Sequence, residues 1–383
     1  MTTDVVAITA VGMASSLGWD AASACAAARA GLSRAAELDN YTLWDEQSKA
    51  PIPMIGHRVT QGAGGFQGIG RLARLGTIAL QDLQARVALP VSTLARTGLF
   101  INLASSYYRE QALVQRAVHP DATDEEESLD TSEAKNREAR LRAELPSLLL
   151  RFSDLAIPPE HCRVLFGDEA GVFGLIQETA DLVRRGALDQ CLVGGIDSNS
   201  DPERLALLSE LGLLKGPDNP SGLIPGEAAA FVLIERLDRA RERTSNVPVA
   251  LGALAVTREP IHRFGNVPSA GVALAEVVAR AVASEDEKTG ALRVMIGGLN
   301  GDRWRAMEWG CALVRLRASG AIKEVEEWFP SVSFGETGAA AGAVSIVMAE
   351  QAFARGYTRG ERIGVWASSD SGFKGAGCVY RPS

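Results

Sequence analysis

The chain has 383 residues, of which 46% are hydrophobic and 22% are charged, and its formal net charge is −8. This length and composition predict large buried cores in roughly two or three domains. The acidic balance argues against nucleic acid as a partner, because proteins that bind phosphate backbones concentrate Lys and Arg. No apolar run approaches the roughly 20 residues needed to cross a bilayer, and no secretory signal is visible, so we expect a cytoplasmic protein without a membrane span.

Short apolar runs alternate along the chain with alanine-rich stretches of helical length. The runs predict buried strands at residues 5–8, 98–101, 164–166, 191–193, 294–296 and 363–366. The stretch between the third and fourth runs has the length and pattern of a helix, which predicts a strand–helix–strand unit with parallel pairing. This alternation is typical of helices packed on sheet faces, so the fold class is α/β.

An acidic insertion at about residues 116–145 differs from the rest of the chain. Its acidic part is followed by a stretch of alternating charges that resembles a helix, from Arg137 to Arg142. Such a pattern is typical of a solvated loop and an exposed helix. The alternative is an insertion that docks a partner or covers a pocket, because loops on a rigid scaffold often carry specificity. Its acidic residues are Asp121, Asp124, Glu125, Glu126, Glu127, Asp130 and Glu133.

Several stretches spread over nearly the whole chain carry a family resemblance. They lie at residues 6–19, 163–171, 193–198, 222–235, 335–343 and 368–375. Together they resemble the β-ketoacyl synthases of the thiolase-like superfamily. The resemblance implies a five-layered αβαβα fold made of two related halves, at residues 1–240 and 241–383. It also implies a homodimer.

The chain departs from this family at the three positions that carry its chemistry. Where the family has Cys, His and His, this sequence has Glu169, Gly297 and Glu336. A carboxylate cannot form the thioester that a condensing thiolate forms, and the imidazoles that assist decarboxylation are absent. None of these motifs contains any of the chain's four histidines, which are His57, His119, His161 and His262. We therefore expect a degenerate member with no catalytic residue of the family and no condensing 3-oxoacyl synthase activity.

The substituted residues define a candidate pocket that we expect to hold neither cofactor nor metal. Three interpretations of its carboxylates stay open: an acid–base pair, a site for Mg²⁺ or Ca²⁺, or a filled pocket in which Glu169 caps the following helix. The pocket candidates are Asp168, Glu169, Asn300, Asp302, Arg303, Glu336, Phe373 and Lys374.

Two parts of this pocket allow more than one interpretation. Arg303 and Arg305 could bind a phosphate-bearing group through their forked donors, or they could join Trp304 and Trp309 in a packed corner or a protein-contact patch. In the family, Phe373 would be a gate over the pocket. Lys374 replaces a small residue beside it, and is expected either to pair with Glu169 or Glu336 or to face solvent.

The lost chemistry favours a protein that acts by binding another protein. The segment 299–310 also resembles ketosynthase-like proteins that accompany type VI secretion spike genes, so our first hypothesis is an adaptor or scaffold for a secretion effector or spike component. The alternative is a non-catalytic partner subunit of a fatty acid or polyketide synthase, as in family variants that replace the Cys by Gln. A third hypothesis is an enzyme with an altered mechanism, acting on acyl-CoA or acyl-carrier substrates through its acidic residues.

Overall fold

A ten-stranded sheet organises the computed structural model, which describes residues 5–118, 132–243, 249–283 and 291–382. Its strands are hydrogen-bonded in the order β10-β9-β11-β12-β8-β1-β7-β6-β4-β5. The N-terminal half contains β1 (Val6–Ser15), β4 (Thr97–Leu103), β5 (Cys162–Phe166), β6 (Gln190–Ser198) and β7 (Glu227–Arg236). The C-terminal half contains β8 (Val249–Arg258), β9 (Leu292–Ile296), β10 (Glu326–Trp328), β11 (Arg362–Ser368) and β12 (Phe373–Tyr380).

The two halves of the sheet repeat one pairing pattern. From β1 outward, the first two pairings (β1–β7 and β7–β6) are antiparallel and the next two (β6–β4 and β4–β5) are parallel. From β8 outward, the series β8–β12–β11–β9–β10 shows the same order. The halves join through two residue pairs, Ala7 with Ala250 and Ile8 with Val249. Each apolar run identified in the sequence is a strand, but β4 lies between β5 and β6, which therefore run parallel without pairing with each other.

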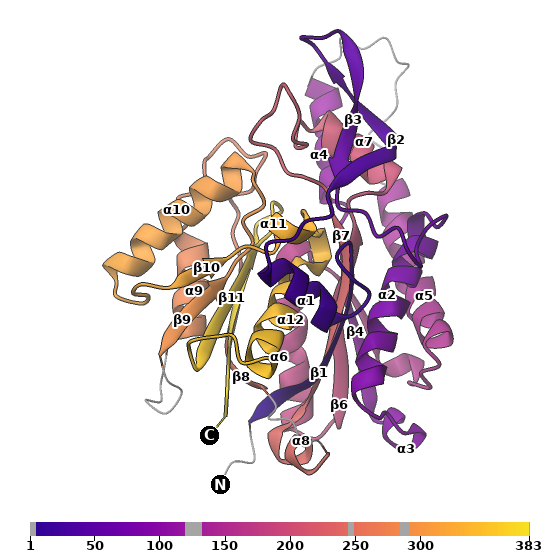
Figure 1. Ribbon diagram of the computed structural model, residues 1–383, viewed down its shortest axis with the longest axis vertical. Coiled ribbons are helices and arrows are strands. Elements are labelled where there is room, and N and C mark those ends of the chain that lie inside the picture. The colour runs from indigo at the N-terminus through magenta and orange to yellow at the C-terminus, as the bar shows by residue number, and fades with distance from the viewer. Residues whose placement is uncertain (1–4, 119–131, 244–248, 284–290, 383) are drawn as a thin grey trace.

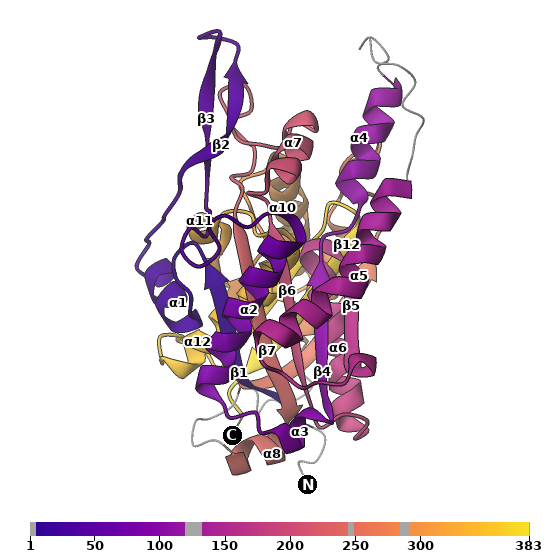
Figure 2. The same ribbon diagram turned by 90° about the vertical axis from the view of Figure 1, so that its right-hand side faces the viewer.

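Helices form three layers, one between the two halves of the sheet and one outside each half, as Figures 1 and 2 show. The central layer packs against strands of both halves. Of the 14 residues in α12, 11 are buried, as expected for a helix that is apolar on all sides. The layers are α2 (Gly68–Arg86) with α5 (Ser132–Phe152) outside the N-terminal half, α6 (Gly171–Arg184) with α12 (Ala341–Ala354) in the centre, and α9 (Val272–Val282) with α10 (Arg303–Ala318) outside the C-terminal half. This is the five-layered αβαβα fold expected from the sequence.

A smaller apolar cluster lies at the upper end of the molecule in Figure 1, where a two-stranded hairpin projects beside two helices. The hairpin is β2 (Ala36–Asp45) with β3 (Ala50–Gly56), and the helices are α4 (Tyr107–Val118) and α7 (Pro202–Glu210). The remaining α-helices of the described residues are α1 (Ala21–Arg29), α3 (Val91–Leu94), α8 (Leu237–Arg243) and α11 (Ser331–Phe334).

The mixed-charge stretch of the acidic insertion forms part of α5, as predicted. Its charged face is exposed, whereas Leu141, Leu145 and Leu149 are buried in the outer core beside α2. Residues 119–131, which contain most of the acidic run, lie outside the described residues. No helix in the described ranges is long and apolar enough to cross a membrane.

Candidate functional site

Glu169 lies on the turn between β5 and α6, at the position where the family resemblance leads us to expect a nucleophile. The turn is a short 3-10 helix, Asp168–Ala170, and Asp168 has a left-handed φ of 51°. A non-glycine residue in this region is strained, and such strain often occurs at functional turns. The Asp168 carboxylate holds the turn by accepting hydrogen bonds from the Ser105 backbone N–H (2.7 Å) and the Ser371 hydroxyl (2.6 Å).

Glu336 lies in the C-terminal half, two residues before the 3-10 turn Gly338–Ala340, which leads into α12. Its backbone N–H donates to the Ile224 carbonyl (2.8 Å). The two oxygens of its carboxylate accept from the Gly338 N–H (2.8 Å) and from Asn300 Nδ2 (2.6 Å). Both glutamates therefore lie just before a central helix, Glu169 within the 3-10 turn before α6 and Glu336 ahead of the 3-10 turn before α12.

Arg305 joins these glutamates into one buried cluster. Its Nη2 donates to Glu169 Oε1 (3.1 Å) and to Asp370 Oδ1 (2.7 Å), and its Nη1 lies 3.8 Å from Glu336 Oε2. The Arg305 side chain is 2% exposed. We call Glu169, Arg305, Glu336 and Asp370 the elbow cluster. Its guanidinium lies within 3.8 Å of a carboxylate oxygen of each of the three acidic residues.

Two further contacts fix the elbow cluster from outside. Tyr108 donates its hydroxyl to Asp370 Oδ2 (2.8 Å). Asp302 begins α10 by accepting from the backbone N–H groups of Trp304 and Arg305, and Arg263 Nη2 donates to the same carboxylate (2.7 Å). Since Asp302 caps the helix that carries Arg305, the cap sets the position of the central guanidinium.

The carboxylates of the elbow cluster differ in acidity because one cation faces three of them. Burial, opposed by Arg305 and reinforced by Glu336, raises the pKa of Glu169 to about 8. Burial also raises the pKa of Glu336. Burial would raise the pKa of Asp370 too, but Arg305 and Arg263 outweigh it and hold that pKa below its ordinary value. A proton on Glu169 is therefore compatible with neutral pH, whereas Asp370 stays ionised.

The raised pKa of Glu169 predicts that the protein loses stability as the pH rises. The folded state holds this proton more tightly than the unfolded chain, so its stabilisation is complete below the ordinary pKa of 4.5 and is lost as pH passes about 8. The Glu169→Gln variant keeps a neutral acceptor for Arg305. Between pH 5.5 and 8.5, its free energy of unfolding should fall by about 1–3 kcal/mol less than that of the wild type. Urea unfolding at both pH values measures this difference, and equal losses in the two proteins would contradict the expectation.

The third substituted position, Gly297, faces a tryptophan instead of an imidazole. A Cβ atom at Gly297 would lie 2.3 Å from both Cε2 and Nε1 of Trp366. Trp366 is fully buried and stacks on Trp309, with ring centroids 4.2 Å apart and an interplanar angle of 17°. The indole therefore occupies the space that a side chain at 297 would need.

The structure brings together some of the predicted pocket residues and separates others. Asp168, Glu169, Asn300, Asp302 and Glu336 lie in or beside the elbow cluster. Glu169 does not cap α6, contrary to one of our interpretations, because α6 has no side-chain cap and the carboxylate binds Arg305 instead.

Three other predicted residues point elsewhere. Both expectations for Lys374 were wrong: its side chain is 2% exposed and its Nζ lies 2.7 Å from Glu308 Oε1. The Phe373 ring packs under the Arg258 guanidinium, 4.9 Å from the ring centroid. Arg303 is exposed on α10.

Sequence reasoning missed the roles of Arg305 and Asp370. The sequence offers phosphate binding, a packed corner or a contact patch for Arg305, which is indeed buried together with Trp309, but it names no partner for the guanidinium, and Asp370 appears only within the C-terminal motif. The available signal was charge: two new carboxylates in a buried pocket require a cation. Arg305, three residues after the helix-capping Asp302, was a candidate for it.

A small cavity lies beside the elbow cluster. The cavity that Glu169 lines measures about 10 Å³, which is roughly the space that one water molecule needs. Tyr108, Asp168, Arg204 and Asp370 are among its other lining residues. An acyl group does not fit in this cavity.

The fold and the site can now be compared with known proteins. No family model matches the chain. Three similar solved structures each cover 99% of it: a type II polyketide synthase acyl-carrier protein in complex with its ketosynthase bound to the hexaketide (TM-score 0.71, 14% identity, 100% of that chain), the ishigamide ketosynthase/chain length factor (0.70, 16%, 100%) and the oxazolomycin ketosynthase domain of Streptomyces albus JA3453 (0.71, 16%, 74%). The chain has the ketosynthase fold.

One curated protein also matches part of the chain in sequence. The tetracenomycin polyketide synthase ketoacyl synthase beta subunit of Streptomyces glaucescens is 31% identical over 94 residues. The match spans 22% of this chain and 23% of that protein. It is thus similar to a ketosynthase beta subunit over about a quarter of that subunit's length.

Proposed function

We propose that this chain is a non-condensing partner subunit of an acyl-chain synthase, and that it acts by binding another protein. The observation that carries the proposal is the elbow cluster. The residue at the nucleophile position is engaged by Arg305, and the cavity beside it has room for about one water. The chain has the ketosynthase fold, but Glu169 and Glu336 stand at two of the positions where condensation needs a thiolate and imidazoles. Both carboxylates face the buried Arg305.

The similar proteins support the idea that this chain binds another subunit of a synthase. One similar structure is a ketosynthase/chain length factor, and the curated match is a ketoacyl synthase beta subunit. Fold alone does not establish function, so the proposal combines this similarity with the altered site. The small cavity argues against the third hypothesis, an acyl-CoA or acyl-carrier enzyme with an acidic mechanism, because such a substrate needs a pocket of its own size.

The secretion-adaptor hypothesis rests on the segment 299–310, and in the structure this segment supplies the cap and the guanidinium of the elbow cluster. These roles are internal to the fold and favour neither partner class. We therefore retain the adaptor as the competing outcome of the binding experiment.

Restoring the thiol alone should not restore condensation. In Glu169→Cys the new sulfur would still lack both imidazoles, because Gly297 and Glu336 remain. We expect wild type and Glu169→Cys to release no carbon dioxide above background from a malonyl thioester, with an intact ketosynthase as the positive control. Release by the wild type would instead support an enzyme of altered mechanism.

The partner class is tested by co-expressing the full chain with an intact ketosynthase subunit from the same genome, and separately with a secretion spike component. Native mass spectrometry should show a one-to-one complex with the ketosynthase. A complex with the spike component and none with the ketosynthase would overturn the proposal in favour of the adaptor.

A further inference from the structure

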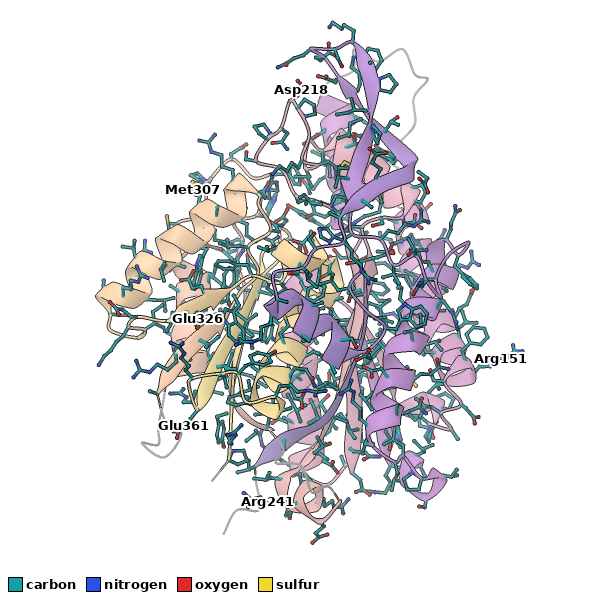
Figure 3. The ribbon with its side chains drawn as sticks, in the orientation of Figure 1. Arg151, Asp218, Arg241, Met307, Glu326 and Glu361 are labelled. Atoms are coloured by element: carbon teal, nitrogen blue, oxygen red, sulfur yellow. The ribbon has the colours of Figure 1, made fainter. Side chains whose placement is uncertain are left out.

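The outer face of α10 is unusual for a helix on the surface of a protein. The helix is the outermost element of the C-terminal half, and Figure 3 shows Met307 on its outward side. Its inner face carries the buried residues Arg305, Glu308, Trp309, Ala312 and Leu316. We define the outer face by the exposed residues Arg303, Met307, Gly310, Val314 and Arg317.

The middle of the outer face is apolar. Met307 is 41% exposed and Val314 is 70% exposed. They are seven residues apart, so they lie on the same side of the helix about 10 Å from each other along its axis. A surface helix normally presents polar side chains on the side away from the core. Met307 and Val314 therefore form a small apolar patch in the middle of the outer face.

Gly310 lies between these two side chains, and its own surroundings do not require a glycine. A Cβ atom there would meet no other atom within 4 Å. Glycine in a helix interior destabilises the helix relative to alanine. What a glycine on an outer face does permit is the close approach of another backbone.

Arginines lie at both ends of the outer face. Arg303 stands in the first turn of α10, where the positive end of the helix dipole disfavours a cation. Among the described residues, no side-chain hydrogen bond or ion pair involves Arg303 or Arg317. The exposed charges of α10 are all positive, although the whole chain carries a net charge of −8. An acidic partner would offset the unfavourable position of Arg303 and would offer a counter-charge to Arg317.

We propose that the outer face of α10 docks an amphipathic helix of another protein, one that crosses at Gly310 and carries acidic side chains near both ends. The distance from Arg303 to Arg317 corresponds to about 21 Å of helix, or about four turns. Gly310 allows the two helix axes to approach to about 8 Å. Residues that lower the stability of a helix without improving the packing of the chain, such as Gly310 and Arg303, are expected at functional surfaces. This inference goes beyond the proposed function, because the elbow cluster takes no part in the docking.

Site-specific cross-linking in the native cell tests the surface. Val314 is replaced by photoreactive p-benzoylphenylalanine in the full chain, and the cross-linked peptide is sequenced. We expect a peptide from a different protein, with apolar residues at helical spacing and Asp or Glu about 14 residues apart. The cross-link yield should fall at least ten-fold in Gly310→Leu and in the double variant Arg303→Glu/Arg317→Glu. It should be unchanged in Arg151→Glu, which lies on the opposite side of the molecule in Figure 3.

Gly310→Leu also separates loss of docking from loss of folding. Leucine has room at this position and favours helix more than glycine does, so the melting temperature should rise by about 1–3 °C while the cross-link is lost. Cross-links to a second copy of this chain, to lipid or to a peptide without acidic residues would each overturn the proposal. A Gly310→Leu yield equal to that of wild type, or no cross-link from wild type, would do the same.

Discussion

Arg305→Met is expected to lower the free energy of unfolding by about 3–5 kcal/mol at pH 8, because it leaves buried carboxylates without their cation. The side chain is 2% exposed and contacts Glu169, Asp370 and Glu336. The carboxylates can escape part of this cost by taking up protons, as the already raised pKa values of Glu169 and Glu336 indicate. The loss should therefore be smaller at pH 5.5 than at pH 8.

The matched control is Arg317→Met, the same substitution on the exposed side of the same helix. Surface changes of this kind usually alter stability by less than about 0.5 kcal/mol. Urea unfolding followed by circular dichroism, at both pH values, compares the two variants with the wild type. A second variant, Arg305→Met/Glu169→Leu, removes one carboxylate and should recover part of the loss. Equal stability of the two single variants would show that the elbow cluster does not hold the fold together.

The layers were expected from the family resemblance, whereas the apolar runs predicted six strands of the ten-stranded sheet, β1, β4, β5, β6, β9 and β11, for a physical reason. A strand buried on both faces reads as a mostly apolar run, and β4 and β6, which are completely buried, each contain such a run. The order of the strands could not be read from such runs, because hydrophobicity does not encode which strands are neighbours. The sequence therefore predicted that β5 and β6 pair with each other, whereas in the structure β4 lies between them and pairs with both.

The site was predictable in its positions but not in its contacts. Glu169 and Glu336 were located by the family motifs, and the fold brings both to Arg305. The partner of Lys374 was not foreseen, because Glu308 reaches it from α10 and two serines, Ser269 and Ser368, complete the shell of the Glu308 carboxylate. Such pairings depend on where distant segments meet, which local patterns do not specify.

Gly297 shows what a missing side chain can mean. In the sequence it is an absence, a position where an imidazole is expected. In the structure, position 297 has to be a glycine because the Trp366 ring occupies the space that a Cβ atom would need. The glycine at position 297 and the packing of Trp366 are therefore coupled, and a substitution at one position has to be considered together with the other.

Gly297→Ala is accordingly expected to destabilise the protein by about 2–4 kcal/mol, at or above the usual range for overpacking. The added methyl group would lie 2.3 Å from two atoms of the Trp366 ring, and stacking on Trp309 keeps that ring from moving aside. Gly298→Ala is the control, because a Cβ there meets its nearest neighbour, Ala367 Cα, at an ordinary 3.5 Å. Thermal and urea unfolding of both variants should show a large loss for position 297 and almost none for position 298.

The same packing predicts how the two positions combine. Trp366→Phe removes the part of the ring nearest Gly297, so Gly297→Ala/Trp366→Phe should lose less stability than the sum of its two single variants, as expected for residues in direct contact. Purely additive losses would mean that the tryptophan is not the obstacle. If the coupling is present, a Cys–His–His set cannot be rebuilt by three substitutions at Glu169, Gly297 and Glu336, because Gly297→His would be blocked until Trp366 is also reduced in size.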